Sequence, residues 1–266
     1  MYRQHFGLKF NPFDKEISTE KLFASRDTKE LDSRLKYMLD SRGICLIVGE
    51  AGSGKSTCLR KLMDNLNHSL YKPCYLALTT LTVKEFYQAL ASLLGETPTH
   101  KKYKLFEQIQ NCINSLYYDQ RITPVIIIDE IHMAPISILD DLRILFNFKA
   151  DSANPFVLIL AGQPQIRNKL ALNTCYPLRQ RISMRYSMQG LTLEETADYC
   201  NSRMKVAGCN NEVFLPSALA AIHTVSGGFP RAINNIAVAS LMYCTERKMM
   251  TVDEEAVYQA NIEIGF

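Results

Sequence analysis

No two cysteines in the sequence stand at the C-x-x-C spacing of common zinc sites, so a structural zinc ion has little support. Most of the eight cysteines lie inside apolar stretches, where a thiol behaves as a small hydrophobic group. We therefore expect reduced thiols in a cytosolic protein. The eight residues are Cys45, Cys58, Cys74, Cys112, Cys175, Cys200, Cys209 and Cys244.

Long hydrophobic runs are also missing. The N-terminus, MYRQHFGLKF, has no apolar region of the kind that signal peptides carry. No apolar run approaches the length that a membrane-spanning helix needs. We therefore expect a soluble, cytoplasmic protein with no membrane partner.

Charge of one sign is not in excess either, because the net charge is only +3 over 266 residues. That balance permits a local patch that binds nucleic acid but does not by itself argue for one. Internal repeats and low-complexity segments are absent from the sequence. With 47% apolar and 21% charged residues, the chain has the composition of an ordinary globular protein with a sizeable core.

Short apolar runs alternate with helical patterns over residues 26–188, which predicts a parallel sheet covered on both faces. The preceding residues, 1–25, lack periodicity and carry phenylalanines around a proline, so we expect an extended segment that packs on the core. The predicted strands are GICLIV (43–48), CYLAL (74–78), PVIIID (124–129), PFVLILAG (155–162) and MRYSM (184–188).

The pattern changes near residue 189. From there to residue 266 we expect consecutive helices with no strand between them, which predicts a small all-helical lid domain. Thr192 with Glu195, and Thr251 with Glu254, have the spacing of a capping box at a helix start.

The stretch GEAGSGKST matches the phosphate-loop pattern G-x-x-x-x-G-K-[ST], with a predicted strand before it and a helix after it. Its glycines allow backbone N–H groups to face phosphate oxygens. Lys55 is expected to reach the β- and γ-phosphates, and Ser56 to bind Mg²⁺. The predicted nucleotide-binding residues are Gly49, Glu50, Ala51, Gly52, Ser53, Gly54, Lys55, Ser56 and Thr57.

Two carboxylates follow the apolar run Val-Ile-Ile-Ile (125–128), at the strand end where parallel sheets bind ligands. Asp129 is expected to hold Mg²⁺, directly or through water, and Glu130 to polarise the attacking water. The alternative is a strand end followed by ordinary polar loop residues, and the phosphate loop argues against it. Gln163, at the end of another predicted strand, could hold that water or sense the γ-phosphate, or be a plain loop residue.

Several arginines are candidates for contact with phosphate, because the guanidinium group binds phosphate in a fork. Arg179, Arg181 and Arg185 lie close together, and one of them could act on the nucleotide of a neighbouring subunit. Arg231 lies in SGGFPR, in the first turn of a predicted helix, where the helix dipole disfavours a cation. An anion such as the γ-phosphate would explain it. For each arginine the alternative is a solvated surface residue.

Taken in order, these motifs resemble those of the AAA+ ATPases. GEAGSGKST resembles Walker A, VIIIDE resembles Walker B, and GGFPR resembles sensor 2 with Arg231. Gln163 resembles sensor 1, although that residue is often asparagine or threonine. Arg179 or Arg181 resembles the arginine finger. Within AAA+ the chain is similar to the ExeA/TniB/TnsC-like group, through FGLKFNPF, AGQPQIRNKL, LRQRI, YCNSRMKVAG and SGGFPRAINN.

The resemblance implies ATP and Mg²⁺ as cofactors and a homo-oligomer, a ring or helical filament with nucleotide between subunits. Transposition helpers of this group assemble on duplex DNA and recruit or activate a DDE transposase. The secretion-type relative carries a membrane segment and a wall-binding region, and neither is visible here, so transposition is expected. The alternatives are a secretion or signalling switch that does not bind DNA, and a replication-type loader.

DNA contact is expected from a basic cluster, HKKYK, between two predicted helices. Lys101, Lys102 and Lys104 could pair with phosphates without reading the base sequence. A solvated basic turn is the alternative. Lys84 and Arg121 are weaker candidates.

Overall fold

The computed structural model describes residues 2–14, 23–78, 81–149 and 152–265. Contacts divide the chain into two units. The α/β unit comprises Glu30–Ala51 and Lys55–Met188. The helical unit joins the described residues of Met1–Lys29, Gly52–Gly54 and Gln189–Phe266.

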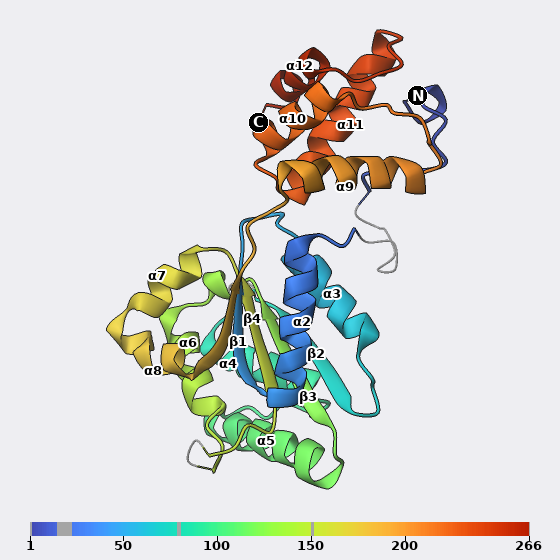
Figure 1. The fold of residues 1–266 in the computed structure, drawn as a ribbon. Helices are drawn as coiled ribbons and strands as arrows, with labels where there is room; N and C mark the ends of the chain where they lie inside the picture. Colours follow the sequence, from blue (N-terminus) through green and yellow to red (C-terminus); the bar gives the residue numbers. More distant parts are fainter. Residues whose placement is uncertain (1, 15–22, 79–80, 150–151, 266) are drawn as a thin grey trace. The chain divides into compact units, whose positions relative to one another are not determined.

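The α/β unit is built on a five-stranded sheet with the order β2-β3-β4-β1-β5 (Figure 1). Every pair of neighbouring strands is parallel, which confirms the predicted sheet. The carboxyl ends of all strands therefore lie at one edge. The strands are β1 (Gly43–Val48), β2 (Tyr71–Ala77), β3 (Thr123–Asp129), β4 (Val157–Gly162) and β5 (Ile182–Ser187).

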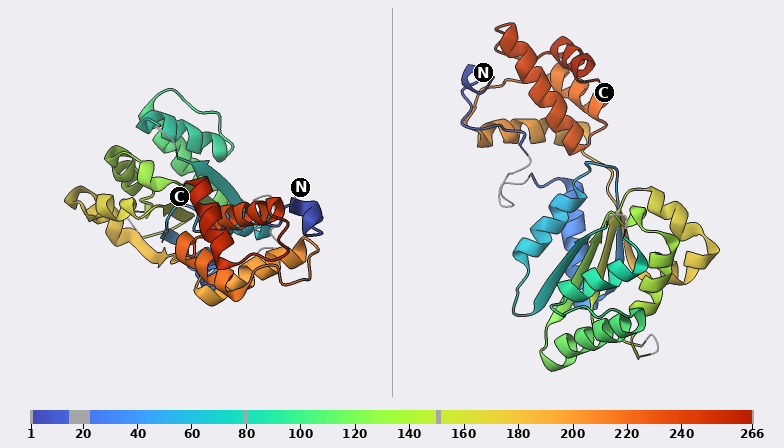
Figure 2. Two further views of the ribbon diagram at one scale, coloured as in Figure 1. Left: turned by 90° about the horizontal axis from the view of Figure 1, so that it is seen from above. Right: turned by 180° about the vertical axis from the view of Figure 1, so that it is seen from behind.

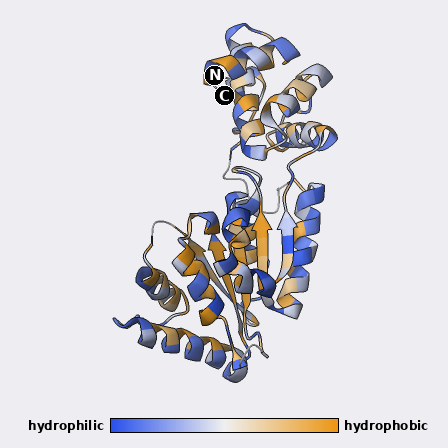
Figure 3. Cartoon of the chain, turned by 90° about the vertical axis from the view of Figure 1, so that its left-hand side faces the viewer, coloured by the Kyte–Doolittle hydropathy of each residue, from blue (hydrophilic) through white to orange (hydrophobic). Residues whose placement is uncertain are grey.

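Successive residues of each strand pack on opposite faces of the sheet. Ile126 and Ile128 belong to the core that includes residues of α4 (Val83–Leu93) and α5 (Lys102–Asn114). Val125 and Ile127 belong to the core that includes residues of α2 (Arg26–Ser41) and α3 (Lys55–Asn65). Both faces are covered (Figure 2), so the central strands are fully buried and apolar throughout (Figure 3).

Helices of the α/β unit include three short ones, α6, α7 and α8, that the periodicity did not predict. They follow β3 and β4 and pack on the apolar core of the sheet, which stabilises helices too short to form alone. The helices of this unit are α2 (Arg26–Ser41, from Glu30 onward), α3 (Lys55–Asn65), α4 (Val83–Leu93), α5 (Lys102–Asn114), η2 (Ser115–Asp119), η3 (Ile131–Met133), α6 (Ile136–Leu145), α7 (Gln165–Ala171), η5 (Asn173–Cys175) and α8 (Tyr176–Arg181).

The helical unit confirms one of the two predicted capping boxes. The Thr192 hydroxyl accepts from the Glu195 N–H, and the Glu195 carboxylate accepts from the Thr192 N–H. The second prediction is wrong: Asp253 caps α12 and accepts from the Ala256 N–H at 2.8 Å. An aspartate is an equally good cap, and its charge favours the helix N-terminus. The helices are α1 (Tyr2–His5), α9 (Leu193–Val206), α10 (Pro216–Ser226), α11 (Pro230–Glu246) and α12 (Glu254–Ile264).

The N-terminal segment is not wholly extended, because α1 occupies Tyr2–His5. Phe6 and Phe13 are buried in the core of the helical unit. The Lys9 N–H donates to the Ala207 carbonyl at 2.9 Å. The prediction for residues 15–22 lies outside the described residues. Within the described ranges, no helix combines the length and apolarity that crossing a membrane requires.

The SGGFPR stretch makes a tight connection between α10 and α11. Gly227 ends α10 in the left-handed conformation, with φ 60°. Gly228 also has a positive φ of 77°, and a Cβ there would stand 2.2 Å from the Leu191 carbonyl oxygen. The Leu191 N–H donates to the Gly228 carbonyl at 2.8 Å. Pro230 is the first residue of α11, as predicted.

Candidate functional site

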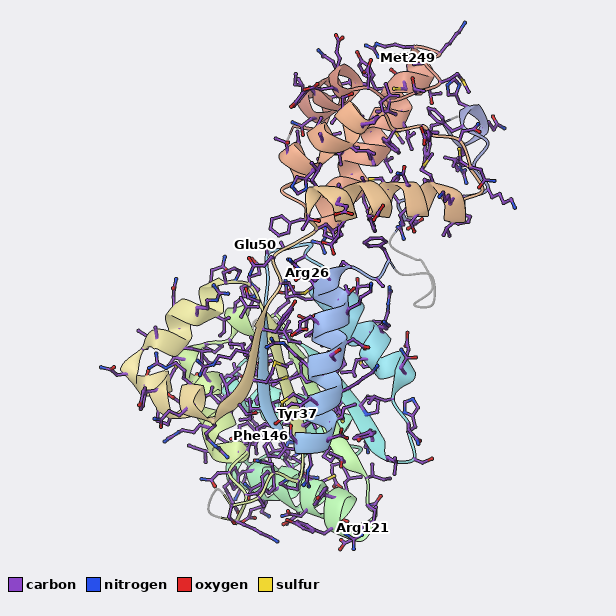
Figure 4. The ribbon with its side chains drawn as sticks, viewed as in Figure 1. Arg26, Tyr37, Glu50, Arg121, Phe146 and Met249 are labelled. Atoms are coloured by element: carbon purple, nitrogen blue, oxygen red, sulfur yellow. The ribbon has the colours of Figure 1, made fainter. Side chains whose placement is uncertain are left out.

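The phosphate-loop motif lies between β1 and α3, at the carboxyl edge of the sheet. Figure 4 shows Glu50 at this end of the α/β unit. Lys55 is only 5% exposed, and its ammonium group donates to the carbonyls of Gly49 and Glu50 at 2.8 and 2.9 Å. The loop therefore curls around a buried positive charge.

The second part of the site joins β3 to α3. Asp129 is 2% exposed, and its Oδ2 accepts from the Ser56 hydroxyl at 2.8 Å. The same oxygen accepts from the Tyr75 hydroxyl on β2 at 2.9 Å. Burial, and then the hydrogen bond to this carboxylate, raise the pKa of Tyr75. Tyr75 was not predicted, because nothing in CYLAL shows which carboxylate its strand will meet.

These groups fit a nucleotide with its magnesium ion. Gly52 and Gly54 have positive φ values, so the backbone can turn its N–H groups toward an anion. Among the described residues, the buried Ser53 hydroxyl has no hydrogen-bond partner. Ser56 and Asp129 supply the oxygen ligands that Mg²⁺ prefers, and Mg²⁺ takes only one or two carboxylates when phosphates complete its shell.

Glu130 follows Asp129 in an unusual conformation. Its φ of 57° and ψ of 33° are left-handed, which is uncommon for a residue other than glycine and concentrates at functional sites. The Glu130 N–H donates to Asp129 Oδ1 at 2.9 Å. The Glu130 side chain is 43% exposed, and its Oε2 lies 3.2 Å from Nδ1 of His132.

Gln163 directly follows β4, which neighbours both β3 and β1. Its N–H donates to the same Nδ1 of His132 at 3.3 Å. The structure thus brings Glu130 and Gln163 to a single imidazole. His132 could not be selected from the sequence, because a histidine after two carboxylates has no distinctive spacing.

The arginines that follow η5 differ in their surroundings. Arg181 donates to the carbonyls of Arg143 and Phe146, at 2.8 and 2.7 Å, and so holds the end of α6. The Arg179 guanidinium lies 5.1 Å from the ring centroid of the exposed Tyr176. Arg185 is also engaged within the chain, because it donates to the Arg179 carbonyl. The structure therefore distinguishes Arg181, which anchors the end of α6, from Arg179, which is half-buried and lies against the Tyr176 ring.

Arg231 is exposed in the first turn of α11, as predicted. Its backbone N–H donates to the Gly52 carbonyl at 3.3 Å, and both residues belong to the helical unit. A Cβ on Gly52 would stand 2.6 Å from the Arg231 Cβ, so only glycine fits there. Residue 52 of the phosphate loop and the start of α11 are thus in direct contact.

The three lysines of the basic cluster are all exposed, but Lys102 is also paired with a carboxylate. Lys102 donates to both carboxylate oxygens of Asp141 on α6, at 2.9 and 2.8 Å. This pairing offsets its charge, so Lys102 is a poor candidate for DNA contact. Lys101 and Lys104 are exposed. Arg121 lies at the opposite end of the sheet from the phosphate loop, as the labels in Figure 4 show.

A phosphate loop, a serine bonded to a strand-end aspartate and a following glutamate, on a parallel sheet of this order, define a P-loop fold with a nucleotide-binding edge. The sequence model of the AAA domain family matches residues 38–170. The chain belongs to this family and has the AAA+ P-loop fold.

One curated relative is general secretion pathway protein A of Aeromonas hydrophila, 32% identical over 91% of this chain. The chain spans only 44% of that relative's length. Solved structures with the same fold include Cdc6p of Pyrobaculum aerophilum, with a TM-score of 0.71, 18% identity, and coverage of 96% of this chain and 71% of the other. The Aeropyrum pernix ORC1 protein in complex with DNA has a TM-score of 0.66 and 17% identity, over 95% of this chain and 68% of the other.

Proposed function

We propose that this protein is an ATP-dependent switch that assembles with other copies of itself on duplex DNA and directs a DDE transposase to its target. The observation that carries the ATP-dependent part is the joining of Lys55, Ser56, Asp129 and Glu130 at one sheet edge. The motifs shared with transposition helpers, from FGLKFNPF to SGGFPRAINN, support the choice of partner.

In this proposal each residue at the carboxyl edge of the sheet has a separate role in ATP hydrolysis. Bound MgATP supplies a γ-phosphoryl group whose charge the metal offsets. Lys55 would exchange its carbonyl partners for phosphate oxygens, and Ser56 and Asp129 would hold the metal. The Glu130 carboxylate accepts the proton of the attacking water, and Gln163 orients that water.

Assembly would bring one copy's arginine to the nucleotide of the next. We assign this role to Arg179, because Arg181 is committed to the end of α6. We assign to Arg231 the sensing of nucleotide from the helical unit, supported by its backbone contact with Gly52.

DNA contact would come from Lys101 and Lys104, which are exposed. The expectation that this class of fold binds DNA is supported by the Aeropyrum pernix ORC1 structure, which contains DNA. Lys104→Ala should weaken binding to any duplex and reduce its salt dependence, whereas Lys102→Ala should leave that dependence unchanged. Equal effects of the two substitutions on the salt dependence would refute this assignment.

The second candidate is an ATP-driven assembly switch of a secretion system that does not bind DNA. The 32% identity to general secretion pathway protein A favours it. None of the eight cysteines, all of which lie in the described ranges, forms a disulfide, which is in keeping with a cytoplasmic place of action under either proposal.

Electron microscopy of the purified protein with duplex DNA separates the candidates. The protein is imaged with a slowly hydrolysed ATP analogue and, in parallel, with ADP. Rings or filaments on DNA with the analogue alone would support the DNA-bound switch. Assembly that ignores DNA, or no DNA binding at low salt, would refute it and leave the secretion-type switch.

A further inference from the structure

Nδ1 of His132 lies within hydrogen-bond distance of two groups, the Glu130 carboxylate and the Gln163 backbone N–H. Nδ1 of His132 is 3.2 Å from Glu130 Oε2 and 3.3 Å from the Gln163 backbone nitrogen. The His132 side chain is only 10% exposed, so water cannot easily take the place of either partner. Among the described residues, Glu130 Oε2 is itself buried and has no hydrogen-bond partner.

Nδ1 can serve only one of these groups at a time. A backbone N–H always donates, so Gln163 requires Nδ1 to carry a lone pair. A carboxylate only accepts, so Glu130 requires Nδ1 to carry a proton. In the structure the Gln163 N–H is placed to donate to Nδ1, and Oε2 of Glu130 faces the same nitrogen at 3.2 Å.

The backbone around His132 is restrained by neighbouring groups, whichever partner its Nδ1 bonds to. Lys169 on α7 donates to the carbonyls of His132 and Ala134, at 2.6 and 2.7 Å. Gly162, which ends β4, leaves so little room that a Cβ would lie 3.1 Å from the His132 nitrogen and 3.5 Å from its Nδ1. These contacts restrain the His132 backbone, and the presence or absence of a proton on Nδ1 then decides which of the two partners the ring can serve.

We propose that His132 is a positioning residue that couples Gln163 to Glu130. When the Gln163 N–H turns away from Nδ1, the ring releases its Nε2 proton to solvent and takes up a solvent proton at Nδ1. The new Nδ1–H then donates to Glu130 Oε2. That bond orients the carboxylate so that its other oxygen can take the proton of the attacking water. The inference rests on the roles proposed above for Glu130 and Gln163.

The first test measures the turnover number and the nucleotide dissociation constant separately in the full chain. His132→Phe keeps a ring of similar shape and removes the nitrogen, so kcat should fall about tenfold while ADP affinity is unchanged. His132→Asn can still donate to the carboxylate and should restore most of the loss. His223→Phe, another half-buried histidine with one side-chain partner, is the matched control and should leave kcat unchanged.

The coupling to Glu130 is tested in a double variant. In a Glu130→Gln background, His132→Phe should change the remaining kcat by less than about twofold, because the group it positions is gone. A tenfold further loss there, or a loss of ADP affinity as large as the loss of kcat, would show a merely structural role and overturn the proposal.

The tautomer itself is read by ¹⁵N NMR of the full chain labelled at its five histidines. The signal that disappears in His132→Phe is that of His132. Nδ1 should be unprotonated without nucleotide and protonated with Mg²⁺ and a slowly hydrolysed ATP analogue. The same tautomer in both states would overturn the proposal.

These outcomes are separate from those that test the proposed function. If the unmodified chain hydrolyses ATP and Glu130→Gln slows it, the site assignment stands whatever His132→Phe does. If Glu130→Gln turns over at the normal rate, the role of Glu130 fails first. A tautomer change on nucleotide binding would then still be visible by NMR.

Discussion

Replacing Gly228 by alanine should destabilise the helical unit far more than replacing its neighbour Gly227. Both glycines have positive φ, 77° and 60°, so alanine pays about 1 kcal/mol of backbone strain at either position. The surroundings differ. A Cβ on Gly228 would stand 2.2 Å from the Leu191 carbonyl oxygen, whereas a Cβ on Gly227 would meet ring carbons of Phe229 at 3.5 Å.

The contact at Gly228 is with backbone, which cannot rotate away as a side chain can. Relieving it would shift the chain by several tenths of an ångström, at a cost of about 1–3 kcal/mol. The shift would also stretch the bond from the Leu191 N–H to the Gly228 carbonyl, now 2.8 Å, worth about 1 kcal/mol. We therefore expect Gly228→Ala to cost about 3–5 kcal/mol and Gly227→Ala about 1 kcal/mol.

Urea denaturation followed by circular dichroism measures both free energies of unfolding. Tryptophan fluorescence is not an option, because the chain contains no tryptophan. Alanine lowers the entropy of the unfolded chain equally at the two positions, so their difference isolates the native contact. Two variants whose free energies of unfolding differ by less than about 0.5 kcal/mol would refute the reasoning.

Three further predictions concern the site and the core of the α/β unit. Lys55→Ala should abolish nucleotide binding and assembly, whereas Glu130→Gln should assemble normally and hydrolyse ATP slowly. A normal rate for the glutamine variant in an ATPase assay would contradict the proposal that Glu130 accepts the proton. Tyr75→Phe removes one of the two donors to Asp129 Oδ2, so the Mg²⁺ concentration for half-maximal activity should rise about tenfold. An unchanged requirement in a Mg²⁺ titration would contradict the supporting role of Tyr75. Burial raises the pKa of the Cys45 thiol to about 12, so at pH 8 a thiol reagent should modify Cys45 only after urea unfolding, as mass spectrometry would show.

Features that depend on local sequence were predicted well. The phosphate loop, the β3 strand before Asp129 and the start of α11 at Pro230 each follow from a short pattern with its own physical reason. The second capping box failed at Thr251, because Asp253 competes for the same role two residues later and is a strong cap itself.

Features that depend on neighbours in space were not predictable. The pairing of Lys102 with Asp141, and of Arg181 with the end of α6, joins residues nearly forty positions apart. Both are ordinary basic residues in the sequence, and only their partners separate them from Lys104 and Arg179.

The chemistry of the site follows from local sequence, because a phosphate loop needs glycines, a lysine and a serine in a fixed local order. The groups that support that chemistry depend on how the strands are arranged in space. Tyr75 reaches Asp129 because β2 and β3 are parallel neighbours, and His132 meets Gln163 because β4 lies beside β3. Strand order is set by how the whole core packs, and no short stretch of sequence contains it.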